Sequence, residues 1–339
     1  MQTLEPLEPT DALTLYLSEK RTEVSDATLY SHKSRLGHFI RWCDERSIDN
    51  LNELTGRDIQ RYKLWRRDDG DLNAVTLKTQ MDTLRVFIRW CESVDGVPMD
   101  LSTKVQSPVL TDGENERDVL LDNESAEAIL AYLNKYDYAS IQHVTLALLW
   151  HTMMRRGAAR ALDLEDYDRE NQLLMVRHRP DTGTAIKNKQ RGERMVALSE
   201  EMCDLLDDWV ATQRPAVTDE YGREPLLATV QGRVHGQTIQ GYVYAMTRPC
   251  VFTGECPEGR DPKTCEAMEN GRAASKCPVS VSPHAVRRGS ITYWLQRDVP
   301  MRVVSDRANV SQDVLDKHYD RRTEREKVEQ RRQYLENVL

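Results

Sequence analysis

One polar stretch divides this chain into two parts, and it constrains the fold more than any other feature. It covers residues 95–118 and reads DGVPMDLSTKVQSPVLTDGENERD, rich in Pro, Gly, Ser and Asp and without apolar periodicity. Such a composition is typical of a linker between domains. The length of 339 residues also favours two or three domains. We therefore expect a first domain over residues 1–95, a linker over 96–118 and a second domain over 119–339.

The first part has apolar residues at helical spacing, in four runs separated by short polar breaks. Residues suited to capping mark the starts: Thr10-Asp11 before the first run, Ser25 before the second and Thr55 before the third. The fourth run begins near Leu77. Each aromatic residue in these runs has a place in a helix core, and we prefer that role to base stacking. The pattern predicts a helical bundle.

The second part combines helices with a small sheet. Residues 125–136 and 142–154 have helical patterns, and the second of these is apolar enough to be buried. Two short β-like runs, 173–177 and 194–198, flank a polar segment rich in Gly, Thr, Asn and Lys, which predicts a hairpin. Residues 202–209 are again helical, as is almost everything from 283 onward. The predicted fold class is mainly α with a small β-sheet.

The composition limits which cellular compartment and which binding partners are expected. No apolar run approaches the roughly 18 residues needed to span a bilayer, and the N-terminus lacks a signal-peptide pattern. We therefore expect a cytoplasmic protein with no membrane partner. The net charge of −8 argues against nucleic acid binding only as a global sum, because binding needs a local positive face. An acidic, arginine-rich chain also fits a salt-loving archaeal host.

Four segments of the second part contain residues that could take part in catalysis. Arg155 follows the apolar helical run, and His284 and Arg287 are one helical turn apart in SPHAVRRGS. Tyr319 lies among charged residues in DKHYDRRTEREK. The turn of the predicted hairpin offers two lysines, Lys187 and Lys189. Each segment alone has an ordinary structural interpretation, such as a surface pair or a core tyrosine.

Taken in order, these segments resemble the tyrosine recombinases, which include phage integrases and Xer-like proteins. The family pattern runs from an Arg motif through a hairpin Lys, H-x-x-R and a Gly-His or Gly-Trp step to a Tyr. Here Arg155 is followed by Leu162 and Asp166 at the family spacing. The resemblance covers residues from about 10 to 339. It implies a helical core-binding domain followed by a catalytic domain of the DNA breaking-rejoining fold.

The sequence departs from the family pattern in two motifs. In the first, the family's Gly and Glu fall on Met153 and Ala158, so that the carboxylate must be missing or come from elsewhere, for example from Asp163. In the second, the Gly-His step falls on Asn309 and Val310. Asn tolerates left-handed backbone geometry as Gly does. Val310, however, cannot hydrogen-bond to a phosphate.

Physical reasoning assigns a role to each of five residues. Arg155 and Arg287 can bind the non-bridging phosphate oxygens and stabilise the transition state without a metal. Lys187, with Lys189 as its rival, can protonate the departing 5′ oxygen, and His284 can handle the proton of the Tyr319 hydroxyl. The resemblance implies that Tyr319 forms a covalent 3′-phosphotyrosine. No cofactor is needed for this chemistry.

The resemblance predicts a site-specific DNA recombinase or integrase. Its partner would be double-stranded DNA, with a homo-tetramer on two synapsed duplexes and a monomer or dimer when free. The charged tail, residues 324–339, would pack on its own domain or dock on a neighbouring protomer. Two alternatives stay open: a non-catalytic DNA-binding relative, which Ala158 and Val310 favour, and an enzyme like a type IB topoisomerase.

Seven cysteines are present, and four of them crowd into residues 250–277. An odd total without an export signal argues against a disulfide framework. The stretch CVFTGECPEGRDPKTCEAMENGRAASKCP has little core of its own, so we expect a Cys-rich insertion held by a structural zinc ion on Cys250, Cys256, Cys265 and Cys277. An iron–sulfur cluster and four unlinked thiols are the alternatives.

Overall fold

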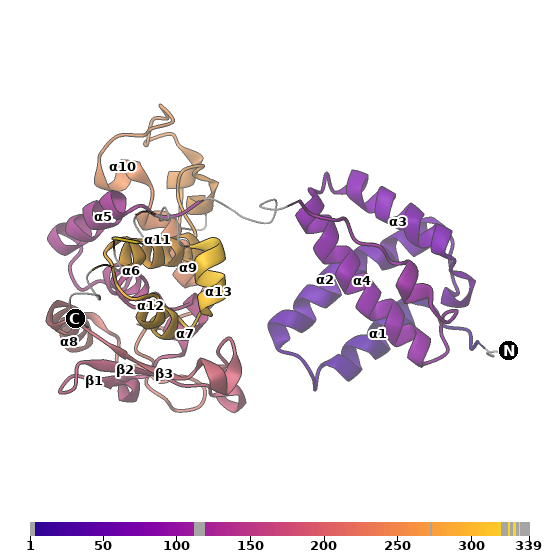
Figure 1. Ribbon diagram of the computed structural model, residues 1–339, viewed down its shortest axis with the longest axis horizontal. Coiled ribbons are helices and arrows are strands. Elements are labelled where there is room, and N and C mark those ends of the chain that lie inside the picture. The colour runs from indigo at the N-terminus through magenta and orange to yellow at the C-terminus, as the bar shows by residue number, and fades with distance from the viewer. Residues whose placement is uncertain are drawn as a thin grey trace. The chain divides into compact units, whose positions relative to one another are not determined.

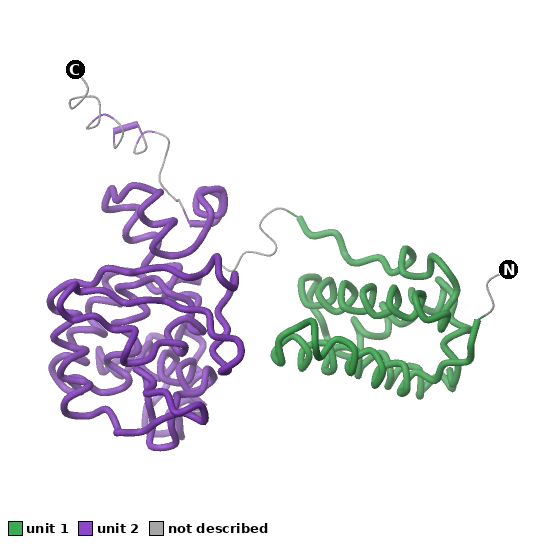
Figure 2. The backbone as a smooth tube through the Cα atoms, turned by 90° about the horizontal axis from the view of Figure 1, so that it is seen from below, with its two compact units in different colours: residues 1–117 green, residues 118–339 purple. Residues whose placement is uncertain are grey.

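The chain forms two compact units, residues 1–117 and 118–339 (Figure 2). The computed structural model describes residues 4–111, 119–271 and 273–319, together with 325, 328, 329 and 332. The segment of the predicted charged tail, residues 324–339, lies almost entirely outside the described residues. Each unit has its own hydrophobic core, and each is considered by itself.

The first unit is a bundle of four helices, as the sequence predicts (Figure 1). They are α1 (Pro9–Lys20), α2 (Asp26–Glu45), α3 (Gly56–Asp69) and α4 (Ala74–Ser93). The predicted caps of α2 and α3 are confirmed, because Ser25 and Thr55 each accept a hydrogen bond from the backbone of the first turn. The predicted cap of α1 is wrong. That helix begins at Pro9, a residue suited to a first helical position because it has no N–H to leave unpaired.

Aromatic residues build the core of the first unit. Phe39 lies at the centre, with its ring 5.1 Å from Tyr62 and 6.2 Å from Phe87, both edge-on. Trp42 and Tyr16 complete the cluster, and all five side chains are buried. Edge-to-face pairs of this kind add to the stabilisation from burial. The aromatic residues therefore have the core role that the sequence favours.

The first unit extends further along the chain than its last long helix. Val97, Leu101 and Val105 are buried in its core, although they belong to the stretch expected as linker. Leu101 opens a short 3-10 helix, Leu101–Lys104, and Arg85 donates two hydrogen bonds to the carbonyl of Val105. Apolar residues at positions 97, 101 and 105 are spaced to face one side, a signal that the Pro and Gly content of the stretch obscured.

The second unit is built around α6 (Ile141–Thr152), which is buried from residue 143 to residue 150. This confirms the buried helix that the sequence predicts. The other helices are α5 (Asn123–Tyr136), α7 (Arg156–Ala161), α8 (Glu200–Asp208), α9 (Gly236–Met246), α10 (Pro249–Phe252), α11 (Pro283–Gln296), α12 (Met301–Ala308) and α13 (Gln312–His318). The fold class is mainly α, as expected.

Two small antiparallel sheets accompany these helices. The first has the order β1 (Tyr167–Asp168), β2 (Leu173–Val176) and β3 (Arg194–Ala197), with Val176 paired to Arg194 where β2 ends and β3 begins. The second joins β4 (Ala228–Thr229) to β5 (Gly232–Arg233). The predicted hairpin is thus confirmed. Its long turn, residues 177–193, lies between β2 and β3.

Helix α11 is held close to the chain segment that precedes α5. A Cβ on Gly289 would overlap the carbonyl oxygen of Leu121, so only glycine permits this approach. The backbone N–H of Leu121 also donates to the carbonyl of Ala285, at 3.1 Å. A separate apolar cluster joins α11 to α12 and α13 through Ile291, Val304 and Leu315. These contacts fix the two elements that carry His284 and Tyr319.

Among the described residues, no helix combines the length and the apolar character that crossing a membrane requires.

Candidate active site

Arg155 follows a sharp reversal of the chain after α6. Met153 takes the left-handed conformation there, with φ 54°, and its side chain is fully buried. The family pattern has Gly at this position, and the backbone conformation is the one that Gly adopts without strain. Arg155 then stands at the N-cap of α7, which directs its guanidinium away from α6 toward the start of α13. The missing glycine leaves the geometry of this turn unchanged.

Arg287 connects three segments from inside the unit. It lies on α11, one turn after His284, and is only 2% exposed. Its guanidinium donates to the carbonyl of Met153 and, at 2.7 Å, to that of Ala308. The turn before Arg155 and the end of α12 are therefore both fixed by the same guanidinium.

Asn309 connects Arg155 to the hairpin turn. It takes the left-handed conformation between α12 and α13, with φ 52°, and its carbonyl accepts a hydrogen bond from Arg155 at 3.1 Å. Its side chain reaches the hairpin turn: the amide oxygen accepts from Asn188 at 2.7 Å, and the amide nitrogen donates to the carbonyl of Arg191 at 3.2 Å. The expectation that Asn replaces Gly in left-handed geometry is confirmed.

Tyr319 ends α13, with its side chain 7% exposed. Its phenol lies within electrostatic range of the guanidiniums of Arg287 and Arg155. Its carbonyl accepts a hydrogen bond from the hydroxyl of Thr292, which holds the end of α13 against α11. Arg155, Arg287 and Tyr319 thus converge within one chain.

The two candidate lysines are at the rim of this region. Lys187 and Lys189 flank Asn188, whose side chain is bound to Asn309, and both are exposed. Asn188 and Lys189 have left-handed backbone conformations, with φ 72° and 52°. A Cβ on Gly192 would overlap the carbonyl oxygen of Lys187, so the turn is folded tightly on itself. The turn that carries both lysines is therefore joined to Asn309, the residue whose carbonyl accepts from Arg155.

A third arginine, which the sequence analysis did not single out, joins the pair. Arg194 begins β3 and donates to the carbonyls of Arg307, at 2.8 Å, and Gly192, at 3.0 Å. Burial and the positive charges of Arg155 and Arg307 lower the pKa of Arg194 to about 10. Burial and Arg155 likewise lower the pKa of Arg287 to about 10. All of these groups still carry a charge at neutral pH.

The positive charge of this region is not neutralised within the protein. Arg155, Arg194 and Arg287 donate to backbone carbonyls, and in the part of the chain that the structure describes none of them is ion-paired to a carboxylate. Crowding like charges without counter-ions is unfavourable unless an anion is to be bound. The three guanidiniums, with the phenol among them, form a site suited to a phosphate group.

His284 is at the edge of the arginine cluster, at the first turn of α11. Part of the imidazole is exposed to solvent. Desolvation of the rest, together with the charges of Arg287, Arg288 and Arg155, lowers the pKa of His284 below its usual value of 6.5. The ring is therefore neutral at pH 7 and able to accept a proton.

The residues at the two departures from the family pattern take structural roles. Val310 is 8% exposed and packs in the apolar cluster of α11, α12 and α13. Ala158 is buried in the main core. Asp163, the substitute considered for the missing Glu, is instead ion-paired to Arg233 and Arg179, in a separate network. It does not supply a carboxylate to Arg155.

The four clustered cysteines form a separate feature. Cys250, Cys256, Cys265 and Cys277 all line one small cavity in the insertion between α9 and α11. Within the residues that can be described, no three thiol, imidazole or carboxylate groups are already arranged to hold a metal ion.

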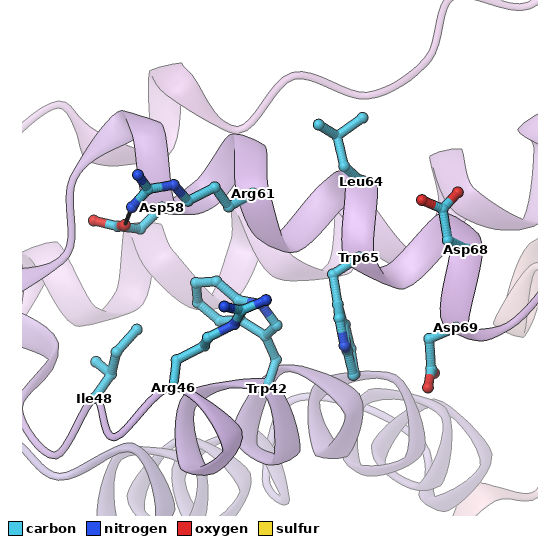
Figure 3. Close-up of a pocket in the computed structure, with 9 residues that line it drawn as sticks. All are labelled: Trp42, Arg46, Ile48, Asp58, Arg61, Leu64, Trp65, Asp68 and Asp69. Carbon is cyan, nitrogen blue, oxygen red and sulfur yellow. Dashed lines mark hydrogen bonds and ion pairs between the residues drawn. The ribbon is translucent and has the colours of Figure 1, made fainter.

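The first unit also has a hollow, of about 900 Å³, between α2 and α3 (Figure 3). Trp42 and Trp65 point into it, and Asp58 is ion-paired to Arg61 at its rim. Since Asp68 and Asp69 also line it, acidic and basic groups are mixed. The hollow therefore has none of the one-sided charge that marks the arginine site.

Comparison with known proteins extends over both units. Residues 11–93 match the model of the phage integrase N-terminal SAM-like domain, and residues 120–249 match that of the phage integrase family. The second match includes Arg155 and Lys187, whereas His284, Arg287 and Tyr319 lie beyond its end.

A curated relative is "Tyrosine recombinase XerC 2" of Ralstonia nicotianae, 25% identical over 219 residues. The match covers 62% of this chain, and the chain spans only 59% of that protein's length. Among solved structures, the Tn1549 transposon integrase in complex with a circular intermediate DNA has a TM-score of 0.64 at 17% identity, over 95% of this chain and 99% of that one. A lambda integrase dimer bound to a COC′ core site has a TM-score of 0.63 at 13% identity, over 94% and 80%. The structural likeness establishes a shared fold.

Proposed function

The chain belongs to the tyrosine recombinase, or phage integrase, family, and from this premise we propose that it cleaves DNA strands at specific sites and rejoins them through a 3′-phosphotyrosine at Tyr319. The single observation that carries the proposal is that the Tyr319 phenol lies within electrostatic range of both Arg287 and Arg155 in one chain. A nucleophile held against two guanidiniums is what transfer of a phosphodiester requires.

In the proposed reaction, the Tyr319 oxygen attacks the phosphorus and the 5′ oxygen of the next nucleotide leaves. Arg155 and Arg287 bind the non-bridging oxygens, whose charge increases in the transition state. His284 accepts the phenol proton, and Lys187 donates a proton to the departing 5′ oxygen. The phosphodiester is replaced by a phosphotyrosine ester of similar energy, so a 5′ hydroxyl can reverse the reaction without ATP.

Arg194 adds a third charge to this proposal. It begins β3, lies within electrostatic range of Arg155 and donates to the carbonyl of Gly192. We assign it the role of a positioning residue that holds Gly192, and with it the lysine turn, next to the arginine pair. Its charge also contributes to the field that attracts a phosphate.

The proposed partner is double-stranded DNA. The solved relatives named above are complexes with DNA, and an uncompensated arginine cluster attracts a phosphate backbone. Strand exchange between two duplexes would require a homo-tetramer assembled on synapsed DNA. The free protein would be a monomer or dimer.

The test is covalent capture on a nicked suicide duplex, from which the cleaved fragment diffuses away. We expect a protein–DNA adduct that survives denaturation and is absent in Tyr319→Phe, which keeps the ring and loses the nucleophile. Candidate target sites are compared at several salt concentrations because phosphate contacts weaken with salt.

Two other outcomes correspond to the alternative functions. Retained DNA binding with no adduct at any salt concentration would identify a non-catalytic relative, an alternative favoured by Val310, a buried side chain with no hydrogen-bonding group. Relaxation of supercoiled DNA without sequence preference would identify an enzyme like a type IB topoisomerase.

The choice between Lys187 and Lys189 has its own test. We expect Lys187→Ala to slow cleavage of ordinary DNA and to recover on a substrate with sulfur at the 5′ bridging position, since a thiolate leaves without a proton. Lys189→Ala is the matched control, two residues away in the same exposed turn. Recovery of Lys189→Ala instead would transfer the role to that residue.

A further inference from the structure

The insertion between α9 and α11 has little regular secondary structure and few buried apolar side chains to stabilise it. Between Phe252 and Ser282 the regular structure of the described residues is limited to two short 3-10 helices, Glu266–Met268 and Ala273–Lys276. The described side chains buried within residues 253–280 are those of small residues, three alanines and Ser280. Loops longer than about 12–15 residues with so little structure are uncommon in compact domains. Something other than an apolar core must hold this one.

The cysteines of the chain fall into two classes. Cys43, Cys91 and Cys203 are fully buried in the two hydrophobic cores, as small apolar residues. The four cysteines of the insertion are half-buried, and all of them line the same cavity. Cys250 is within electrostatic range of Cys256 and Cys277. Thiols separated by up to 27 positions in the sequence are thus gathered at one point.

The backbone around these thiols forms tight turns. The N–H of Gly259 donates to the carbonyl of Cys256 at 2.9 Å, and the N–H of Met268 to that of Cys265 at 2.8 Å. Gly254 and Gly259 have positive φ, 79° and 65°, which allows the chain to reverse twice between Cys250 and Cys265. Short turns of this kind bring thiols from separate segments around one centre.

Positive charge accompanies the thiols. Arg248 and Arg260 line the same cavity. Arg248 is 9% exposed and donates to the carbonyls of Ala245 and Ala267, which fixes it at the base of the insertion. Four thiolates around a divalent ion leave two negative charges in excess, and the two guanidiniums would balance them.

We propose that Cys250, Cys256, Cys265 and Cys277 bind one zinc ion, which provides the core that the insertion lacks. Zinc suits four thiolates in a tetrahedron, with sulfur–metal distances of about 2.3 Å. In the described residues the sulfurs line the cavity without yet being at coordination geometry. Rotation of the cysteine side chains, on turns that are already formed, would bring them to the ion.

The small size of the cavity favours a single metal ion over an iron–sulfur cluster. It offers about 10 Å³ to a sphere the size of water, the room of a single small atom. A single ion fits this space, whereas a cluster of irons and sulfides would require the insertion to open. Thiolate ligands in a tetrahedral set also favour zinc over magnesium or calcium, which prefer oxygen.

The proposed zinc site would anchor α11. Both ends of the insertion are fastened to each other, since the hydroxyl of Thr247 accepts from the N–H of Val281 at 3.0 Å and donates to its carbonyl at 3.4 Å. Val281 lies three residues before His284. A zinc-held insertion would therefore keep the start of α11, with the imidazole it carries, in a fixed position.

Metal content of the full-length purified chain tests the proposal without reference to DNA cleavage. We expect about one zinc per chain, and cobalt substitution should give the absorption bands of tetrahedral thiolate coordination. A thiol reagent should react only slowly with the four cysteines of the zinc-loaded chain. After a strong chelator removes the zinc, all four should react quickly.

Variants give a second readout. Cys256→Ser and Cys265→Ser should each lower zinc retention at least tenfold, and trypsin should then cut faster at the exposed Lys263. Cys91→Ala is the matched control, because it removes one thiol from the core of the first unit and should retain the zinc. Chelation of the unaltered chain should reproduce the faster cleavage, and added zinc should reverse it.

Three results would overturn the proposal. One is a reduced chain that holds no zinc after addition of the metal and reacts quickly at four thiols. Another is a chain whose cluster thiols appear only after reduction, which would indicate disulfides. The third is a purified chain with the visible absorption of an iron–sulfur cluster and no zinc.

Discussion

Two clusters of arginines in the second unit differ in what their guanidiniums contact. The carbonyl-bound cluster is Arg155, Arg194 and Arg287, which donate to backbone carbonyls. The carboxylate-paired cluster is Arg179, Arg223 and Arg233, which form ion pairs with Asp163, Asp166 and Asp219. Both are largely buried, and both tie together segments far apart in the sequence.

The pKa of Arg179 and the pKa values of the carbonyl-bound arginines shift in opposite directions. The hydrogen bonds that Arg179 donates to Asp166 raise its pKa, whereas burial lowers the pKa of Arg155, Arg194 and Arg287. The pKa of Asp219 shows the effect of the same ion pairs. Burial alone would raise this pKa, but hydrogen bonds from Arg233 and the backbone lower it to about 2. In the carboxylate-paired cluster, the protein itself supplies the counter-ions. In the described residues the carbonyl-bound cluster has no carboxylate partner, and uncompensated charge of this kind is typical of an anion-binding site.

The largest expected effect is on stability, in the carboxylate-paired cluster. Arg233→Ala should reduce the free energy of unfolding by about 3–5 kcal/mol, because Asp163 and Asp219 would stay buried after losing one of the two arginines that they share, with Arg223 as the other. Arg169→Ala, on the surface beside Glu200 and Asp207, is the control and should have a much smaller effect on the free energy of unfolding, because water screens its ion pairs. Chemical denaturation of the full chain measures both. Equal losses in the two variants would remove the distinction between clusters.

In the carbonyl-bound cluster the effect should be on reaction rate. Arg155→Ala should slow adduct formation by about 10²–10³-fold, the usual loss when one donor to a developing charge is removed. Its free energy of unfolding should change by only about 1 kcal/mol, since the lost hydrogen bond to Asn309 is offset by relief of repulsion. Single-turnover capture and denaturation are measured on the same preparation. A large loss of stability with normal cleavage would contradict the assignment.

A smaller effect is expected at Asn309, where conformation and contacts can be separated. Asn309→Gly keeps the left-handed backbone and loses the two side-chain bonds to the hairpin turn, whereas Asn309→Ala also strains the backbone. The Ala variant should therefore be less stable than the Gly variant by about 1 kcal/mol. Both should slow cleavage equally if the contact with the lysine turn matters. Normal cleavage by the Gly variant would show that it does not.

The smallest expected effect is a shift in the titration of His284. Its folded-state pKa lies below 6.5 because of desolvation and the nearby arginines. Stability is thus lost as pH falls through 6.5, where the unfolded chain takes up a proton that the folded chain resists. Arg287→Gln should move the pKa back toward 6.5, as NMR of the ring proton can measure. No shift would mean that the cluster does not act on His284.

Local sequence signals were sufficient for much of the fold. Ser25 and Thr55 marked helix starts because a cap depends on a few adjacent residues. The apolar run of α6 and the two β runs around the hairpin turn were equally plain, since periodicity is local. The end of the first unit was not predicted. The apolar spacing of Val97, Leu101 and Val105 is a local signal, but it does not identify the residues distant in the sequence on which they pack.

The order of the motifs determined which residues belong to the candidate site, because family spacing survives even where Gly is replaced by Met153 or Asn309. Tertiary structure alone decided how their charges are used. It brought Arg194 beside Arg155, drew Asp163 into a different network and placed the phenol of Tyr319 within electrostatic range of Arg287. The reason is physical: the charge state and contacts of a guanidinium depend on its neighbours in space, and the sequence records only its neighbours in the chain.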